Sequence, residues 1–203
     1  TPLTTLLFEM EKETSAEAAK LLLQQATGLV GVDIENFNPT TDGTAEQQAQ
    51  YLNAGVQVVS TLKTLSAAVA TTSGATETDV FAKGLKLLAE KIVSPEGSNV
   101  TLTDTAVVDN LATGLKGFYS ATVSDADLAK VSLAITNVNS KIQAITQYDK
   151  TGTIAAEANN LMAVAQTTLA DQARSLVGSQ TAMDLAANGW EINLLDALAA
   201  IEH

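Results

Sequence analysis

The chain has 203 residues, enough for one large domain or two small ones with a sizeable core. Its 23 acidic and 11 basic side chains give a formal net charge of -12, which argues against nucleic acid as a partner because phosphates would be repelled. The absence of cysteine excludes disulfides and thiolate metal sites. No apolar run reaches the ~18 residues that a membrane-spanning helix needs, so membrane insertion is not expected.

Apolar residues recur at helical spacing along the whole chain, and no alternating pattern of useful length indicates a strand. The composition, rich in alanine and leucine with three prolines, also favours closely packed helices. We therefore predict an all-α multi-helix bundle of seven to eight helices with short loops and one longer irregular loop at about 29–43. In chain order the predicted helices cover 3–13, 16–27, 44–70, 76 to the break at Pro95, 104–118, 124–145, 154–176 and a last segment with Trp190, Leu194, Leu198 and Ile201.

Cap residues mark several of the predicted helix ends. Ser15 is a good N-cap, and Gly28 is a natural C-terminal stop. Thr76 and Ser124 each stand three residues before an aspartate, which is the pattern of a capping box. The segment 95–99 breaks the helical pattern and is a candidate boundary between two subdomains, although a five-residue break is also an ordinary interhelix loop.

Two of the predicted helices have distinctive apolar patterns. The segment 44–70 carries a stripe so broad that burial on more than one side is expected, which predicts the central helix. The segment 124–145 has apolar residues in strict 3-4-3-4 steps, too short for a free coiled coil, so we predict packing inside the bundle, with a partner helix as the alternative. The seam consists of Leu128, Val131, Ile135, Val138, Ile142 and Ile145.

Catalytic side chains are scarce. The only histidine is the terminal His203, so histidine-based triads and metal sites are not expected. Paired carboxylates occur near predicted helix starts or on solvent faces, where acids interact favourably with the helix dipole. We therefore predict no enzyme activity. The carboxylate groups in question are Glu9/Glu11/Glu13, Glu77/Asp79 and Asp125/Asp127.

Calcium is the one cofactor that the sequence leaves open. Residues 38–43 resemble the first half of a calcium-binding loop, with glycine at the sharp turn. The pattern then fails, because Ala49 stands where a bidentate glutamate is required. A looser site remains as a hypothesis, against a loop whose side chains make turns and cap a helix. The candidate calcium ligands are Asp33, Glu35, Asn38 and Asp42.

Four stretches of the first seventy residues carry a resemblance: Thr1-Pro2-Leu3-Thr4-Thr5-Leu6-Leu7, then a helix pair ending Ala26-Thr27-Gly28-Leu29, then Val32-Asp33-Ile34-Glu35-Asn36-Phe37-Asn38-Pro39, and Asn53-Ala54-Gly55-Val56-Gln57-Val58-Val59. They resemble a helical segment of very large bacterial surface proteins, similar to repeat adhesins with cadherin-like or haemolysin-type calcium-binding repeats elsewhere. The resemblance implies that 1–203 is a single helical domain from a longer protein. It also implies an extracellular or cell-surface location, with the targeting signal outside this chain, and supplies no catalytic residues.

The leading hypothesis is thus a non-enzymatic extracellular module of a bacterial surface protein, with a role in adhesion or in structure. Its expected partner is a protein or a glycan at a cell surface. The alternative is a ligand-binding module for a glycan, a small apolar molecule or calcium. Trp190 could stack on a sugar in that case, although a tryptophan at this place in an amphipathic helix is more often a core residue.

Overall fold

A computed structural model describes residues 1–95, 97, 100–148 and 154–176. These residues form an all-helical bundle, as predicted, with the irregular loop at 29–43. The predicted last helix with Trp190, and His203, lie outside the described residues. The described helices are α1 (Pro2–Met10), α2 (Ala16–Thr27), α3 (Ala45–Ser73), α4 (Glu77–Val93), α5 (Thr105–Tyr119), α6 (Asp125–Gln143) and α7 (Ile154–Leu176).

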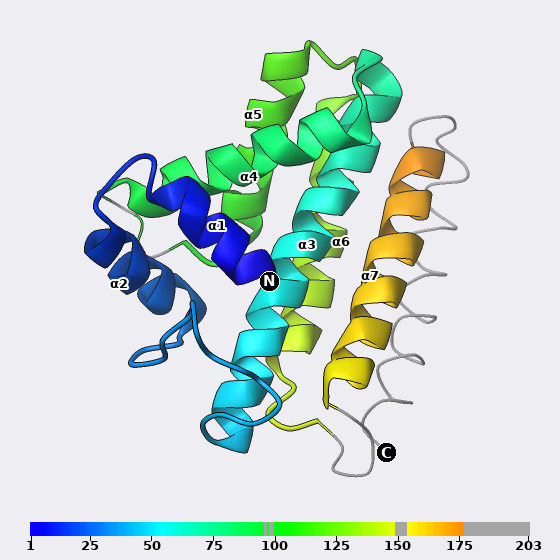
Figure 1. The fold of residues 1–203 in the computed structure, drawn as a ribbon. Helices are drawn as coiled ribbons and strands as arrows, with labels where there is room; N and C mark the ends of the chain where they lie inside the picture. Colours follow the sequence, from blue (N-terminus) through cyan, green and yellow to red (C-terminus); the bar gives the residue numbers. More distant parts are fainter. Residues whose placement is uncertain (96, 98–99, 149–153, 177–203) are drawn as a thin grey trace.

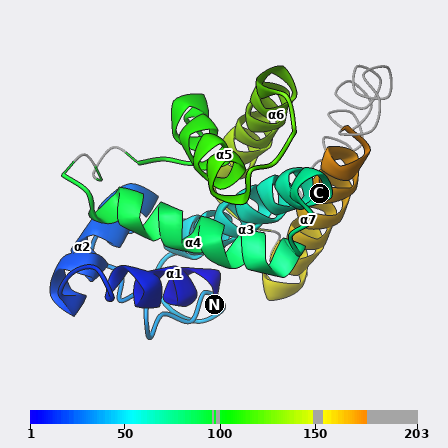
Figure 2. The ribbon, with the colours of Figure 1, turned by 90° about the horizontal axis from the view of Figure 1, so that it is seen from above.

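The long helix α3 is the centre of the bundle, as its broad apolar stripe predicts. It contacts each of the other six helices. The view from above shows α1, α2 and α4 on one side of α3 and the pair α5 and α6 on the other (Figure 2). Helix α7 lies alongside α3 (Figure 1). Near the C-terminal end of α7, Arg174 donates from Nε and Nη2 to the two carboxylate oxygens of Glu77, the first residue of α4.

The predicted cap residues begin and end these helices. The Ser15 hydroxyl accepts a hydrogen bond from the Ala18 amide, and Gly28 ends α2 with a φ of 73°. Thr76 and Ser124 accept in the same way from the amides of Asp79 and Asp127. These side chains satisfy N–H groups that the first turn of a helix leaves without an intrahelical partner.

Two helix ends differ from the prediction for identifiable reasons. Helix α1 stops at Met10, because Met10 is the last residue that the core buries and the charged residues after it lie in a turn. Helix α3 continues past Ala70 to Ser73 and ends at Gly74, which has a φ of 75°. The Thr71 and Thr72 hydroxyls bond to carbonyls one turn back, so both side chains find their hydrogen-bond partners within the helix.

The main core is one cluster of buried side chains drawn from all seven helices, on both sides of the 95–99 segment. The predicted subdomain boundary there remains a prediction. All six seam residues of α6 are at most 5% exposed within this chain, which confirms packing inside the bundle. A second, smaller cluster joins α3, the end of α6 and α7 through Val56, Ile142 and Leu169.

The contact between α3 and α6 is unusually polar for the inside of a bundle. One stripe of α3 carries Glu46, Gln50, Asn53, Gln57, Thr61 and Thr64, in steps of three and four residues. We call this set the polar stripe of α3. Asn53, Thr61 and Thr64 of the stripe are buried, and the buried Asn139 of α6 donates a hydrogen bond to Thr61. Glu46, at the N-terminal end of the stripe, is exposed, and Gln50 and Gln57 are half-buried.

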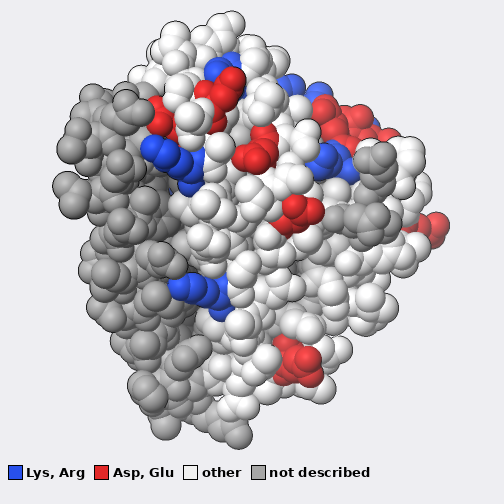
Figure 3. Space-filling model, turned by 180° about the vertical axis from the view of Figure 1, so that it is seen from behind, with Lys and Arg blue, Asp and Glu red and all other residues white. Residues whose placement is uncertain are grey.

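Within the described ranges, no helix is both long and apolar enough to cross a bilayer. The surface carries few charges for its size. On the face opposite to the view of Figure 1, acidic and basic side chains are scattered and separated by broad uncharged areas (Figure 3).

Candidate functional site

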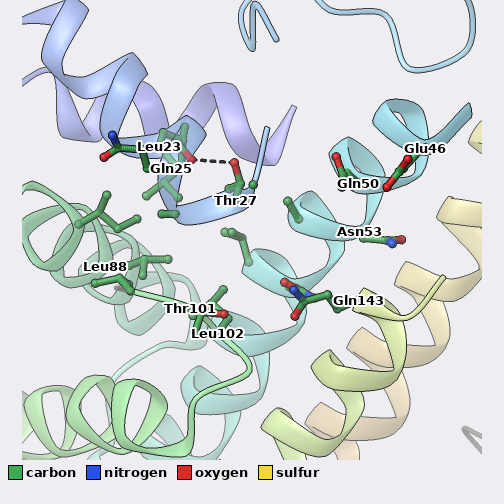
Figure 4. A pocket seen from close by; sticks show the side chains of 18 of the residues that line it. Leu23, Gln25, Thr27, Glu46, Gln50, Asn53, Leu88, Thr101, Leu102 and Gln143 are labelled. Carbon is green, nitrogen blue, oxygen red and sulfur yellow. Dashed lines mark hydrogen bonds between the residues drawn. The ribbon is translucent and has the colours of Figure 1, made fainter. Parts of the chain in front are cut away.

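A pocket of about 640 Å³ opens where the polar stripe of α3 emerges from under α6. Its walls come from α1, α2, α3, α4, the segment 100–102 and the C-terminal end of α6 with the residues just after it (Figure 4). Ligand pockets in proteins commonly measure about 300–1,000 Å³, so the volume is that of a binding site for a small molecule or a short chain segment.

One wall of the pocket is formed by polar side chains, of which one is charged. Glu46, Gln50, Asn53 and Gln57 are spaced so that they share one face of α3. Because a helix rises 1.5 Å per residue, this row is about 16 Å long. Gln25 from α2 and Gln143 from the end of α6 line the pocket from either side.

The floor of the pocket is aliphatic. Leu23 and Leu88, which line the pocket, are core residues and at most 1% exposed. A pocket with one polar wall and an aliphatic floor suits an amphipathic ligand. The apolar lining consists of Leu6, Leu23, Ala26, Ala54, Val58, Leu88, Ile92, Val100 and Leu102.

Hydrogen bonds to neighbouring segments hold part of the polar wall in place. Asn53 donates from Nδ2 to the Ile145 carbonyl at 2.7 Å, and its Oδ1 accepts from the Tyr148 hydroxyl. Gln57 donates from Nε2 to the Asn139 carbonyl at 2.9 Å. These bonds connect the wall to α6 and to the segment after it. They occupy both the nitrogen and the oxygen of the Asn53 side-chain amide.

Asn139 fixes the opposite wall from inside the bundle. It is fully buried, and its Nδ2 donates to the Leu102 carbonyl at 2.8 Å and to the Thr61 hydroxyl at 2.9 Å. Since Leu102 lines the pocket, Asn139 couples the polar stripe to the pocket wall.

The remaining amides of the wall are available to a ligand. Within the described part of the chain, the side chains of Gln25, Gln50 and Gln143 have no hydrogen-bond partner. Glu46 is exposed and is also unpaired among the described residues. It is the one charged side chain among the described residues that line the pocket. The pocket therefore favours neutral or cationic ligands over anions.

The candidate calcium ligands lie in the loop 29–43, away from the pocket. Asn36 donates to the Asp33 carboxylate, and this bond lowers the pKa of Asp33. Glu35 forms an ion pair with Lys20, and its hydrogen bond raises the Lys20 pKa. Asn38 accepts from Thr40 and donates its amide N–H to Asp42, a pattern of local turns.

No group of three acidic or histidine side chains suited to a metal occurs in the described ranges. The calcium hypothesis stays a prediction.

Apolar residues anchor this loop to the bundle, as its sequence indicates. Val32 and Ile34 are at most 4% exposed, and Phe37 packs on Tyr51 with ring centroids 5.2 Å apart. The Tyr51 hydroxyl donates to the Ile34 carbonyl at 3.1 Å.

The carboxylate groups considered for catalysis make structural contacts. Asp79 accepts from the Thr76 hydroxyl at the start of α4, and Glu77 pairs with Arg174. The Arg174 hydrogen bond holds the pKa of Glu77 below its usual value of 4.5. Asp125 pairs with Lys116. Glu9 pairs with Lys12. These contacts fit the structural interpretation of Glu9, Glu77, Asp79 and Asp125.

Sequence reasoning missed the pocket itself, although a signal was present. The apolar stripe of α3 is interrupted by polar residues at 46, 50, 53, 57, 61 and 64, which is a helical face of its own. Comparison with protein-family models, with curated protein sequences and with solved structures finds no match for this chain. The resemblance to bacterial repeat surface proteins therefore remains a prediction.

Proposed function

We propose that this chain is a non-enzymatic binding module of a bacterial surface protein, and that it binds its partner in the pocket beside α3. The observation that carries the proposal is a set of three carboxamides, those of Gln25, Gln50 and Gln143, which line the pocket beside aliphatic residues and have no hydrogen-bond partner among the described residues. Solvent-facing amides need no special explanation singly, but three that line one pocket together with aliphatic side chains support a role in recognition.

The same lining supports a role in binding over one in catalysis. Among the described lining residues, Glu46 is the one ionisable side chain, and it is exposed. General acid–base chemistry needs a group of tuned pKa within reach of the substrate, usually with a second group to orient it. The residues of this pocket offer hydrogen bonds and apolar contact instead.

A variant that fills the pocket tests the proposal. Gln50→Trp places a large side chain in the pocket at a half-buried position of α3, and Asn137→Trp adds the same group on the exposed side of α6 as the control. Purified protein would be screened against immobilised peptides and against neutral and acidic glycans. We expect a class of ligand that the wild type and Asn137→Trp retain and Gln50→Trp loses. The proposal would be refuted if Gln50→Trp retained the same ligands as the wild type, or if the wild type retained none.

A further inference from the structure

The chemistry of the pocket narrows the class of ligand, given that the pocket is the binding site proposed above. No lysine or arginine is among the described residues that line it, and Glu46 adds one negative charge. A phosphate, sulfate or carboxylate on the ligand would have no counter-charge there. The ligand is therefore neutral or positively charged where it touches the wall.

The hydrogen-bonding groups of the wall match those of a peptide main chain. A carboxamide offers one acceptor oxygen and two N–H donors, and each peptide unit offers one donor and one acceptor. One carboxamide can therefore bond the N–H and the C=O of the same ligand segment. Gln25, Gln50 and Gln143 are available for this, since none has a side-chain partner among the described residues.

The length of the wall fits a short extended segment. The row from Glu46 to Gln57 is about 16 Å long. An extended chain advances 3.3 Å per residue, so about five residues span the row. Successive side chains of an extended segment point to opposite sides, which would place every second one on the aliphatic floor and the others toward solvent.

The floor favours a peptide over a sugar. No aromatic side chain lines the pocket in the described part of the chain. A sugar or nucleobase ring would therefore lack a flat surface on which to stack, whereas aliphatic side chains of a peptide find leucine, isoleucine and valine. Recognition of proline-rich helices also depends on aromatic grooves, which argues for an extended conformation.

We propose that the pocket binds an extended peptide segment of about five residues, with its main chain on the carboxamides of Gln25, Gln50 and Gln143 and its apolar side chains on the aliphatic floor. The exposed carboxylate of Glu46, at one end of the row, accepts a free amino terminus or a basic side chain of the segment. The partner is thus a protein that presents a flexible, uncharged or basic stretch.

The test uses a bead-bound library of random heptapeptides together with an array of neutral oligosaccharides. Peptides retained by the wild type are resynthesised and titrated calorimetrically against Gln50→Leu and Gln143→Leu, which keep the size of the side chain and remove its amide. Asn137→Leu, on the exposed side of α6, is the matched control. We expect each pocket variant to weaken binding about tenfold or more and the control to change it less than about twofold.

A second pair of variants tests the role of charge. Glu46→Gln is expected to remove the preference for a free amino terminus over an acetylated one, and Glu17→Gln, on the exposed face of α2, to leave it intact. Equal melting temperatures of all variants would show that folding is unchanged.

The outcomes separate the two proposals. Neutral glycans that bind in a manner sensitive to Gln50→Leu, with no such peptide, would overturn the peptide inference and leave the proposed function standing. The absence of any pocket-dependent ligand from both collections would overturn both. Peptide binding that the pocket variants leave unchanged would place recognition elsewhere and overturn the inference.

Discussion

Asn139→Ala should destabilise the bundle much more than the same change at a neighbouring asparagine. The Asn139 side chain is fully buried, and both hydrogens of its amide are used, one on Leu102 and one on Thr61. The substitution leaves the Leu102 carbonyl without this donor in a residue that is 8% exposed. It also leaves a void between α3 and α6.

The size of the effect follows from these contacts. Two lost hydrogen bonds contribute about 1 kcal/mol each, and a stranded buried carbonyl costs about 1–3 kcal/mol. Part of this is offset, because the Asn139 Oδ1 is buried without a partner among the described residues, and its removal relieves the cost of its desolvation. We expect the free energy of unfolding to fall by about 2–4 kcal/mol.

Urea denaturation followed by circular dichroism measures this change. Asn137→Ala is the control, because Asn137 has the same side chain on the same helix and is exposed, and its effect should stay within about 0.5 kcal/mol. Since Asn139 also holds the Leu102 wall, peptide binding should weaken in Asn139→Ala even where the protein is fully folded. A loss of stability below about 1 kcal/mol, equal to that of the control, would refute the reasoning.

Three further predictions concern backbone, pH and metal. Gly74→Ala should destabilise the fold by about 1–2 kcal/mol, because Gly74 has a φ of 75°. Gly117→Ala should stabilise it by about 0.5–1 kcal/mol, because Gly117 lies inside α5 with open space around it. Equal effects of the two substitutions in thermal melts would contradict this. The pKa of Glu77 is lowered by Arg174, so the carboxylate stabilises the fold above pH 4.5 and the contribution is lost as pH falls through the folded-state pKa. The difference between wild type and Glu77→Gln should accordingly be at most about 1 kcal/mol at neutral pH, as for other exposed pairs, and vanish in acid; a constant difference would argue against it. The local hydrogen bonds of the loop 29–43 predict that calcium raises the melting temperature no more than magnesium does; a calcium-specific rise abolished by Asp42→Asn would establish the site instead.

The sequence predicts helix positions well where a cap residue acts locally. Ser15, Thr76 and Ser124 each accept from the amide three residues further along, so their role depends on a few neighbouring residues. Helix α1 ends where the tertiary core stops burying its residues, and a local sequence pattern does not contain that information. Helix α3 continues through Thr71 and Thr72, whose hydroxyls bond within the helix.

The candidate site was harder to predict for a physical reason. Its residues come from α1, α2, α3, α4, α6 and the segment 100–102, so no short motif contains them. The polar stripe of α3 is visible in the sequence, but its pattern does not tell which half α6 covers. That depends on the end of α6 at Gln143 and on the antiparallel register set by Asn53 and Asn139.

The most direct test of the account is NMR observation of the side-chain amide groups during titration with a peptide selected from the library. If the polar wall binds the peptide, the NH₂ resonances of Gln25, Gln50 and Gln143 shift together and saturate at one dissociation constant, while that of Asn137 stays in place. Saturable shifts confined to residues outside the pocket, with these three glutamine signals unchanged, would contradict the account.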